Sequence, residues 1–164
     1  MGISQRSCLW KEHHGPGWVR IKTILDSGAA ESIAPPSMAK GVRIKASEMS
    51  KQGKSYDAAN GGKIANLGQQ FIHVTTNEGR QGWTKCQVGE VRDPLMSVSQ
   101  ICDQGNTVRF DSTGGWIHNL TDKSWTRFER HHNVFELDLW LTSSDACGEP
   151  QEATGQPRFT RLGQ

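Results

Sequence analysis

The chain has 164 residues, a net charge of +2 and a hydrophobic content of 34%. That length suits one domain, and so small a charge argues against intrinsic disorder and against a strongly basic nucleic-acid binder. No apolar run approaches the roughly 18 residues of a membrane-spanning helix, and residues 1–17 lack the apolar stretch of a secretory signal. We expect a cytoplasmic protein that is not secreted, contacts no membrane and does not bind nucleic acid directly.

The cysteines and histidines do not form a metal-binding pattern. The four cysteines are scattered with no Cys-x-x-Cys spacing, which indicates free thiols in a reducing compartment. Two histidine pairs, His13-His14 and His131-His132, consist of adjacent residues, which point to opposite faces of a strand. The sequence therefore predicts no metal site and no cofactor.

Composition separates a central folded part from two polar ends. We expect a flexible N-terminal tail over 1–17 and a disordered tail over 142–164, which is rich in Ser, Gly, Pro, Glu and Gln. Between these ends, alternation of apolar and polar residues predicts short strands. The expected strands are 19–25, 42–46, 56–59, 63–67, 71–76, 83–88, 107–110, 116–119 and 134–141.

Turns and one helix complete this pattern. Asn60-Gly61-Gly62 lies between two short runs and predicts a hairpin. Residues 94–105 predict the one helix, with Ser97 as its cap, Gly105 at its end and Cys102 as a small core residue on its apolar face.

One tripeptide of chemical interest, Asp26-Ser27-Gly28, directly follows the first strand. An exposed strand-end turn would have the same composition. A buried pair of such carboxylates, however, shares a proton: the ionised member activates water and the protonated member donates to the substrate carbonyl. The similar run 111–115 has an extra residue before Gly and fits a hairpin turn instead. One motif per chain therefore predicts half an active site, which a symmetric homodimer completes.

Four segments in sequence resemble one protein family. ILDSGAAESIAPPSM resembles the active-site segment of retropepsin-like aspartic proteases, and YDAANGGKIANLGQQFIHV resembles their flap hairpin. PLMSVSQICDQGNTVRF is similar to the terminal helix and strand in the form carried by Ty1/copia-type retrotransposon polyproteins. VRFDSTGGWIHNLTDKSW and NVFELDLWL are similar to the segment between protease and integrase in those polyproteins. Together the resemblance covers about 18–141.

The resemblance implies an all-β fold. Residues 18–110 would form a retropepsin-like, closed or partly open β-barrel with one short helix, and 111–141 would add a C-terminal β-meander. It also implies a retropepsin-type aspartic endopeptidase that acts as a homodimer on extended peptide or polyprotein substrates, without a cofactor. Such a protein would work in the cytoplasm or in a retroelement particle.

The resemblance assigns roles to individual residues. Asp26 would be the catalytic carboxylate, one from each subunit. The Ser27 hydroxyl would hydrogen-bond across the dimer axis, and the Gly28 amide would help to orient the carboxylate. The substrate-binding and flap positions would be Ala29, Ala59, Asn60, Gly61 and Gly62.

A second hypothesis comes from the departures from that family. Ser97-Val98-Ser99 replaces the Gly-Arg/Asn-Asp pattern at the start of the terminal helix, and the segment after Phe110 is longer than a minimal retropepsin needs. The alternative function is a catalytically inactive retropepsin-like fold that serves as a dimerisation or protein-binding module in a larger assembly. Oligomeric state and inhibitor binding discriminate between the two.

Overall fold

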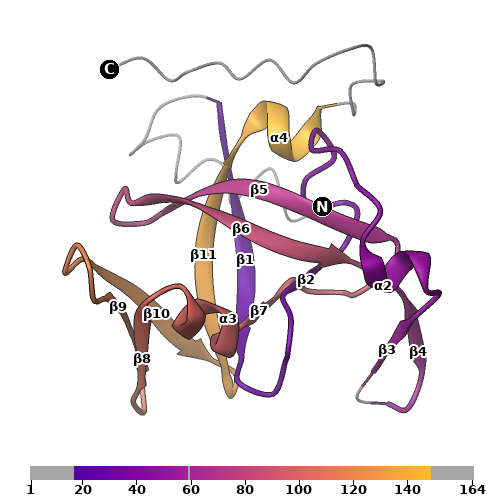
Figure 1. The fold of residues 1–164 in the computed structure, drawn as a ribbon. Coiled ribbons are helices and arrows are strands. Elements are labelled where there is room, and N and C mark those ends of the chain that lie inside the picture. The colour runs from indigo at the N-terminus through magenta and orange to yellow at the C-terminus, as the bar shows by residue number, and fades with distance from the viewer. Residues whose placement is uncertain (1–16, 59, 149–164) are drawn as a thin grey trace.

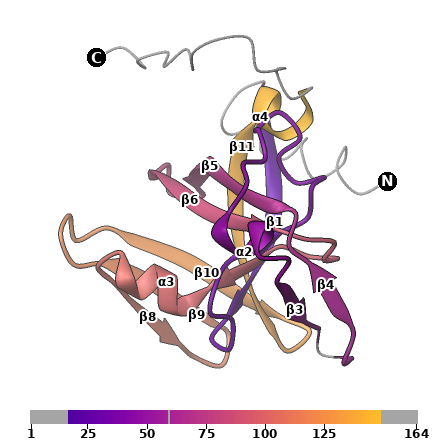
Figure 2. The ribbon, with the colours of Figure 1, turned by 45° about the vertical axis from the view of Figure 1, so that its right-hand side comes forward.

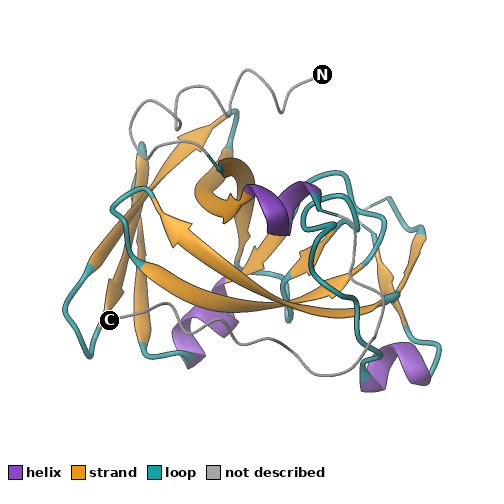
Figure 3. Cartoon of the chain, turned by 90° about the horizontal axis from the view of Figure 1, so that it is seen from above, coloured by secondary structure: helices purple, strands orange, loops and turns teal. Residues whose placement is uncertain are grey.

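The computed structural model describes residues 17–58 and 60–148, and the fold is mostly β (Figure 1). The first strands are β1 (Trp18–Asp26), β2 (Ile33–Ala34), β3 (Ser55–Asp57), β4 (Lys63–Ala65), β5 (Gly68–Thr76) and β6 (Gln81–Val88). The later strands are β7 (Leu95–Ser97), β8 (Asn106–Phe110), β9 (Gly114–Asn119), β10 (Trp125–His131) and β11 (Val134–Thr142). Short helices α2 (Glu48–Lys51), α3 (Val98–Asp103) and α4 (Ser143–Cys147) lie between or after them (Figure 3). None of the helices in the described ranges has the length and apolar character needed to cross a membrane.

Six strands pair in a closed circuit. The order β1-β7-β2-β6-β5-β11 returns to its start because β11 also pairs with β1. The β1–β11 pairing is antiparallel and runs from Trp18 opposite Thr142 to Ile24 opposite Glu136. Both strands run side by side through the centre of the molecule, and β5 and β6 cross them (Figure 1). The circuit thus joins the first and last strands of the described chain.

The remaining strands form two smaller arms. β10, β9 and β8 continue the sheet from β11 as an antiparallel meander, while β3 and β4 form a separate two-stranded hairpin. Figure 2 shows the meander and this hairpin projecting on opposite sides of the circuit. The strand order therefore places β11, from the expected C-terminal extension, between β1 and β10 in one sheet.

Alternation along β1 explains how this strand joins the core. Val19, Thr23 and Leu25 are buried, and the Thr23 hydroxyl donates to the Leu137 carbonyl at 2.7 Å. β11 adds a largely buried stretch at its C-terminal half, where Leu139 and Leu141 are almost fully covered. The other members of the core cluster include Ala34, Met38, Ile72, Val74, Cys86, Met96, Ile117 and Phe128. These apolar contacts hold β1 in the interior as far as Leu25.

Most expected strands are confirmed, as are the hairpin turns at 60–62 and 111–115. The prediction of a strand over 42–46 is wrong, because in this segment only Lys45 forms a β-bridge, an isolated one opposite Gln69. β10 was not expected, because its sequence, WTRFERH, shows only a short alternation of apolar and polar residues.

The helix prediction for 94–105 needs a correction. Leu95–Ser97 form β7, so α3 is limited to Val98–Asp103. Ser97 does cap α3 and Gly105 takes a φ of 84°, as predicted. Cys102 is exposed, so its assignment to the core is wrong. The helix is too short to bury a full apolar face.

The expected tails also differ from the structure. The prediction of disorder is wrong for 142–148, because Thr142 ends β11 and caps α4. The α4 backbone accepts a hydrogen bond of 2.9 Å from the Gly41 amide, and its Ala146 is buried. α2 and α4 therefore add to the single helix expected. Residues 1–16 and 149–164 lie outside the described part of the chain.

Candidate active site

Asp26 is the last residue of β1 and the first polar side chain after the buried Leu25. Its carboxylate is half-buried, and Oδ1 accepts a hydrogen bond of 2.7 Å from the Gly28 amide. A Cβ added at Gly28 would lie 3.3 Å from that same oxygen. Glycine at this position therefore lets the backbone approach the carboxylate closely. The loop thus holds Oδ1 of a partly exposed carboxylate.

The segment after Asp26 is braced by Ser97. Parallel pairing of β1 with β7 places Ser97 opposite Asp26, and its side chain is fully buried. The Ser97 hydroxyl donates to the Ala29 carbonyl at 2.6 Å, while its amide donates to the Ser32 hydroxyl at 2.9 Å. One serine therefore holds the loop at two points, in its middle and at its end.

Gln100 adds a second brace from α3. Its Oε1 accepts a hydrogen bond of 2.9 Å from the amide of Ser32, and Ser32 is buried. Gln100 itself follows the N-cap Ser97, whose Oγ accepts from the Gln100 amide at 3.3 Å. The start of α3 therefore acts as a scaffold for the loop 27–32.

Ser27 and Gly28 lie at the exposed turn of this loop. Ser27 makes no hydrogen bond to any residue of the described ranges, so its proposed bond across a dimer axis stays a prediction. Ala29 is half-buried and is held only through its carbonyl. The exposed side of the loop is thus available to a second copy or to a substrate.

The hairpin expected around Asn60 is confirmed as β3–β4, and its role as a flap stays a prediction. Its turn is closed by a hydrogen bond of 2.8 Å from the Ala58 amide to the Gly62 carbonyl, and Gly61 takes a φ of 81°. The Asn60 side chain accepts from the Gly62 amide at 2.9 Å. Ala59 lies outside the described residues. No hydrogen bond among the described residues joins this tip to Asp26.

The base of the hairpin is tied to the loop by Tyr56. The Tyr56 hydroxyl donates to the Glu31 carboxylate at 3.3 Å and accepts from the Asn66 amide at 2.8 Å. Asn66 also donates to the Gln87 side chain on β6 at 3.0 Å. Burial, followed by the negative charge of Glu31, raises the pKa of Tyr56 to about 12. The hairpin is therefore anchored both to β6 and to the segment following Asp26.

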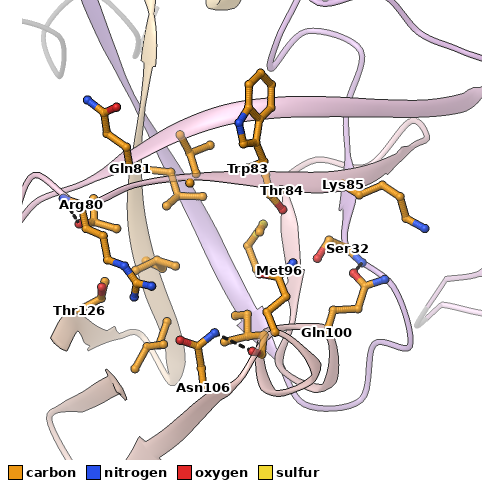
Figure 4. A pocket seen from close by; sticks show the side chains of 18 of the residues that line it. Ser32, Arg80, Gln81, Trp83, Thr84, Lys85, Met96, Gln100, Asn106 and Thr126 are labelled. Carbon is orange, nitrogen blue, oxygen red and sulfur yellow. Dashed lines mark hydrogen bonds between the residues drawn. The ribbon is translucent and has the colours of Figure 1, made fainter. Parts of the chain in front are cut away.

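One cavity of the molecule lies beside α3. A groove of about 400 Å³ is lined by β6 on one side and by α3 and Asn106 on the other (Figure 4). Asp26 does not line it, and only Ser32 and Gln100 connect it to the loop. We assign the candidate chemistry to Asp26 because the groove holds no nucleophile–base pair, whereas Asp26 has an oriented carboxylate.

The histidines, cysteines and carboxylates of the described ranges include no group of three that could hold a metal ion. A comparison with protein-family models, curated proteins and solved structures gives no match. Functional assignment therefore rests on the residues of this chain.

Sequence patterns identified Asp26 and Gly28, which the structure joins by a hydrogen bond, but missed the residues that brace them. Ser97 was expected only as a helix cap. Its opposition to Asp26 comes from a three-residue parallel strand, and a pairing between distant segments leaves no local periodic signal. Glu31 and Tyr56 were likewise missed as a pair, since 25 positions separate them.

Proposed function

We propose that this chain is one subunit of a retropepsin-type aspartic endopeptidase that cleaves extended peptide or polyprotein segments. The observation that carries the proposal is the Asp26 carboxylate, held by the Gly28 amide at the end of a buried strand and braced by Ser97. This arrangement presents one oriented carboxylate at an exposed loop. A carboxylate in that position is half of the shared-proton pair that hydrolyses peptides by acid–base catalysis.

The strand circuit and the hairpin support the same proposal. A closed circuit of six strands is compatible with a retropepsin-like barrel, and β3–β4 would supply the flap over a bound peptide. The substrate would lie extended, paired through its backbone with the flap and with the loop after Asp26. The resemblance to Ty1/copia polyproteins supports a polyprotein as the substrate.

In the proposed mechanism two Asp26 side chains meet across a two-fold axis and share one proton. The ionised carboxylate takes a proton from water as the water oxygen attacks the scissile carbonyl carbon. The protonated carboxyl group donates its proton to the carbonyl oxygen, giving a neutral tetrahedral diol. Collapse of the diol breaks the C–N bond. The protonated carboxyl group gives its proton to the leaving amine, the ionised carboxylate takes a proton from a diol hydroxyl, and the pair returns to its shared-proton state. The Gly28 amides keep both carboxylates oriented throughout.

Substitution of Asp26 by Asn tests the site. Asp26→Asn keeps the shape of the side chain but removes the base, so we expect cleavage of a peptide library to fall by at least about 100-fold. Asp111→Asn is the matched control, because Asp111 accepts from Thr113 and Gly114 in the β8–β9 turn and pairs with Arg127 at 3.8 Å, and it has no proposed role in cleavage. Equal cleavage by the wild type and Asp26→Asn would overturn the assignment.

The oligomeric state tests the shared site independently. Sedimentation should show a dimer whose dissociation on dilution abolishes cleavage and the binding of a transition-state-mimic inhibitor of aspartic proteases. A monomer that cleaves at full rate contradicts the mechanism. A stable dimer that binds no inhibitor supports the alternative, a catalytically inactive dimerisation or protein-binding module.

A further inference from the structure

β6 is paired along only part of one edge. Along its full length it pairs with β5, but on its other side it pairs with β2 only at Gln87 and Val88. The Gln87 amide donates to the Ser32 carbonyl at 2.8 Å, so the backbone of Gln87 faces away from β5. Backbone direction alternates along a strand. The N–H and C=O groups of Gln81, Trp83 and Lys85 therefore face the same way, and they have no hydrogen-bond partner within 17–58 and 60–148.

This free edge borders the groove. Residues Arg80–Lys85 form one wall, while Gln100 of α3 and Asn106 of β8 stand on the other (Figure 4). The floor is apolar and comes from four strands, with Val74, Met96, Ile117, Leu137 and Leu139 lining it. A volume of about 400 Å³ falls within the range of ligand pockets. An open strand edge beside an apolar floor matches an extended chain, whose backbone pairs with the edge and whose alternate side chains enter the floor.

The charges on the rim of the groove indicate which kind of peptide would bind there. The wall formed by Arg80–Lys85 carries two cations, Arg80 and Lys85, against one lining carboxylate, Asp103 of α3. Arg80 is paired with Asp122 at 3.5 Å, whereas Lys85 is exposed and has no ion-pair partner in the part of the chain that the structure describes. Trp83 beside it is 65% exposed. An acidic side chain placed across from Lys85 would complement this end.

We propose that the groove binds an extended peptide segment as an added strand on β6, with apolar side chains at alternate positions and an acidic side chain opposite Lys85. The inference does not depend on Asp26, which lies outside the groove. Ser32, which lines the groove, is the only residue of the loop 27–32 that does so, and the docking surface is therefore separate from the candidate active site.

Gly82 provides a way to fill the groove. A Cβ added at Gly82 meets no atom within 4 Å, and the side chain of the next inward residue, Thr84, points toward the cavity (Figure 4). The Cβ position at Gly82 is therefore open, and we expect the side chain of Gly82→Trp to extend into the groove. Trp83→Pro removes an edge N–H that the sheet itself does not use, and Trp83→Ala removes the same side chain while keeping the N–H.

The probe is a labelled peptide, Thr-Val-Glu-Val-Thr-Val-Thr, in which the valines face the floor and the glutamate faces Lys85. Binding is measured by fluorescence anisotropy, and hydrogen exchange locates it. We expect slower amide exchange over Gln81–Lys85 and at least about tenfold weaker binding to Gly82→Trp and Trp83→Pro. Trp83→Ala should retain binding within about threefold, and a peptide with Lys in place of Glu should bind more weakly. Thermal unfolding establishes whether each variant folds. If Trp83→Pro does not fold, Gly82→Trp alone tests the proposal.

Three results overturn the proposal. The first is absence of binding to the wild type at millimolar peptide, and the second is unchanged binding to Gly82→Trp. The third is protection of Gln81–Lys85 that rises with protein concentration in the absence of peptide, which assigns the edge to a second copy. None of these results changes the expected effect of Asp26→Asn on cleavage.

Discussion

The Ser97 hydroxyl donates a hydrogen bond of 2.6 Å to the Ala29 carbonyl and so joins the start of α3 to the loop that follows Asp26. The same hydroxyl oxygen accepts from the Gln100 amide at the N-terminus of α3. A single buried side chain therefore satisfies backbone groups on both segments. Its loss would leave those groups without partners in the interior.

Ser97→Ala should destabilise the fold and misplace the loop. Loss of a helix cap and of a buried hydrogen bond predicts a decrease of about 1–3 kcal/mol in the free energy of unfolding. Urea denaturation measures this decrease. Ser99→Ala is the control, because Ser99 is exposed and its hydroxyl contacts only that of Ser97, so its effect should stay below about 0.5 kcal/mol. Equal effects of the two variants would contradict the bracing role.

Tyr56 should titrate unusually high, and its absorbance can be followed directly because it is the only tyrosine of the chain. Burial and the neighbouring Glu31 raise its pKa from 10.0 to about 12. Tyrosinate absorbance should therefore appear near pH 12 in the native protein and near pH 10 in urea. A midpoint near 10 in the native protein would contradict the burial of Tyr56 and its contact with Glu31.

The same shift predicts the direction of a stability change. A raised pKa means that the fold favours the neutral hydroxyl, so the stabilisation is complete below pH 10 and is lost as pH rises toward about 12. Tyr56→Phe should lack this component of the alkaline loss, although it loses the hydrogen bonds to Glu31 and Asn66 at every pH. Unfolding free energies of both proteins across this pH range test the prediction.

The cysteines should separate into reactive and protected thiols. Cys102 and Cys147 are exposed, whereas Cys86 is fully buried, and burial raises the pKa of its thiol to about 11. In a Cys8→Ser variant, a thiol reagent at neutral pH should label Cys102 and Cys147 rapidly and Cys86 only after unfolding. Rapid native labelling of Cys86, located by mass spectrometry, would contradict its place in the core.

A fragment that ends at Phe110 should not fold. It lacks β11, which pairs with β1 from Trp18 to Ile24 and supplies the buried Leu137, Leu139 and Leu141. Exposing that edge and that apolar surface removes the closed circuit. Circular dichroism and amide proton dispersion should show a folded protein for residues 17–148 and an unfolded chain for 17–110. A cooperative unfolding transition in the shorter fragment would make the segment after Phe110 an accessory.

Local patterns predicted much of this fold, because alternating side chains and turn residues act over a few positions. The hairpin at Asn60-Gly61-Gly62 and the strand ending at Asp26 are such cases. Very short strands escaped: β2 has two residues and β7 three, and both exist only because distant strands pair with them. α4 also escaped, since its stability comes from docking against Gly41 rather than from an apolar stripe.

In the candidate site, too, local contacts were predicted and long-range contacts were missed. Asp26 and Gly28 are two positions apart, and the family resemblance implied that the Gly28 amide orients the carboxylate. Ser97 reaches Ala29 across 68 positions, and Gln100 reaches Ser32 across the same separation. These contacts depend on the register of β7 against β1, which no local signal specifies.

The pairing of β1 with β11 has a consequence for how the protein folds. The Thr23 hydroxyl finds its acceptor in Leu137, 114 positions later, and the amide of Ser143 finds its acceptor in Gly17. During synthesis β1 leaves the ribosome long before β11 has been made. The apolar side chains and the strand edge of β1 therefore stay unpaired during that time. Contacts of such long range predict slow refolding. A nascent chain stalled before Val134 should therefore engage chaperones, which release it once β11 has emerged.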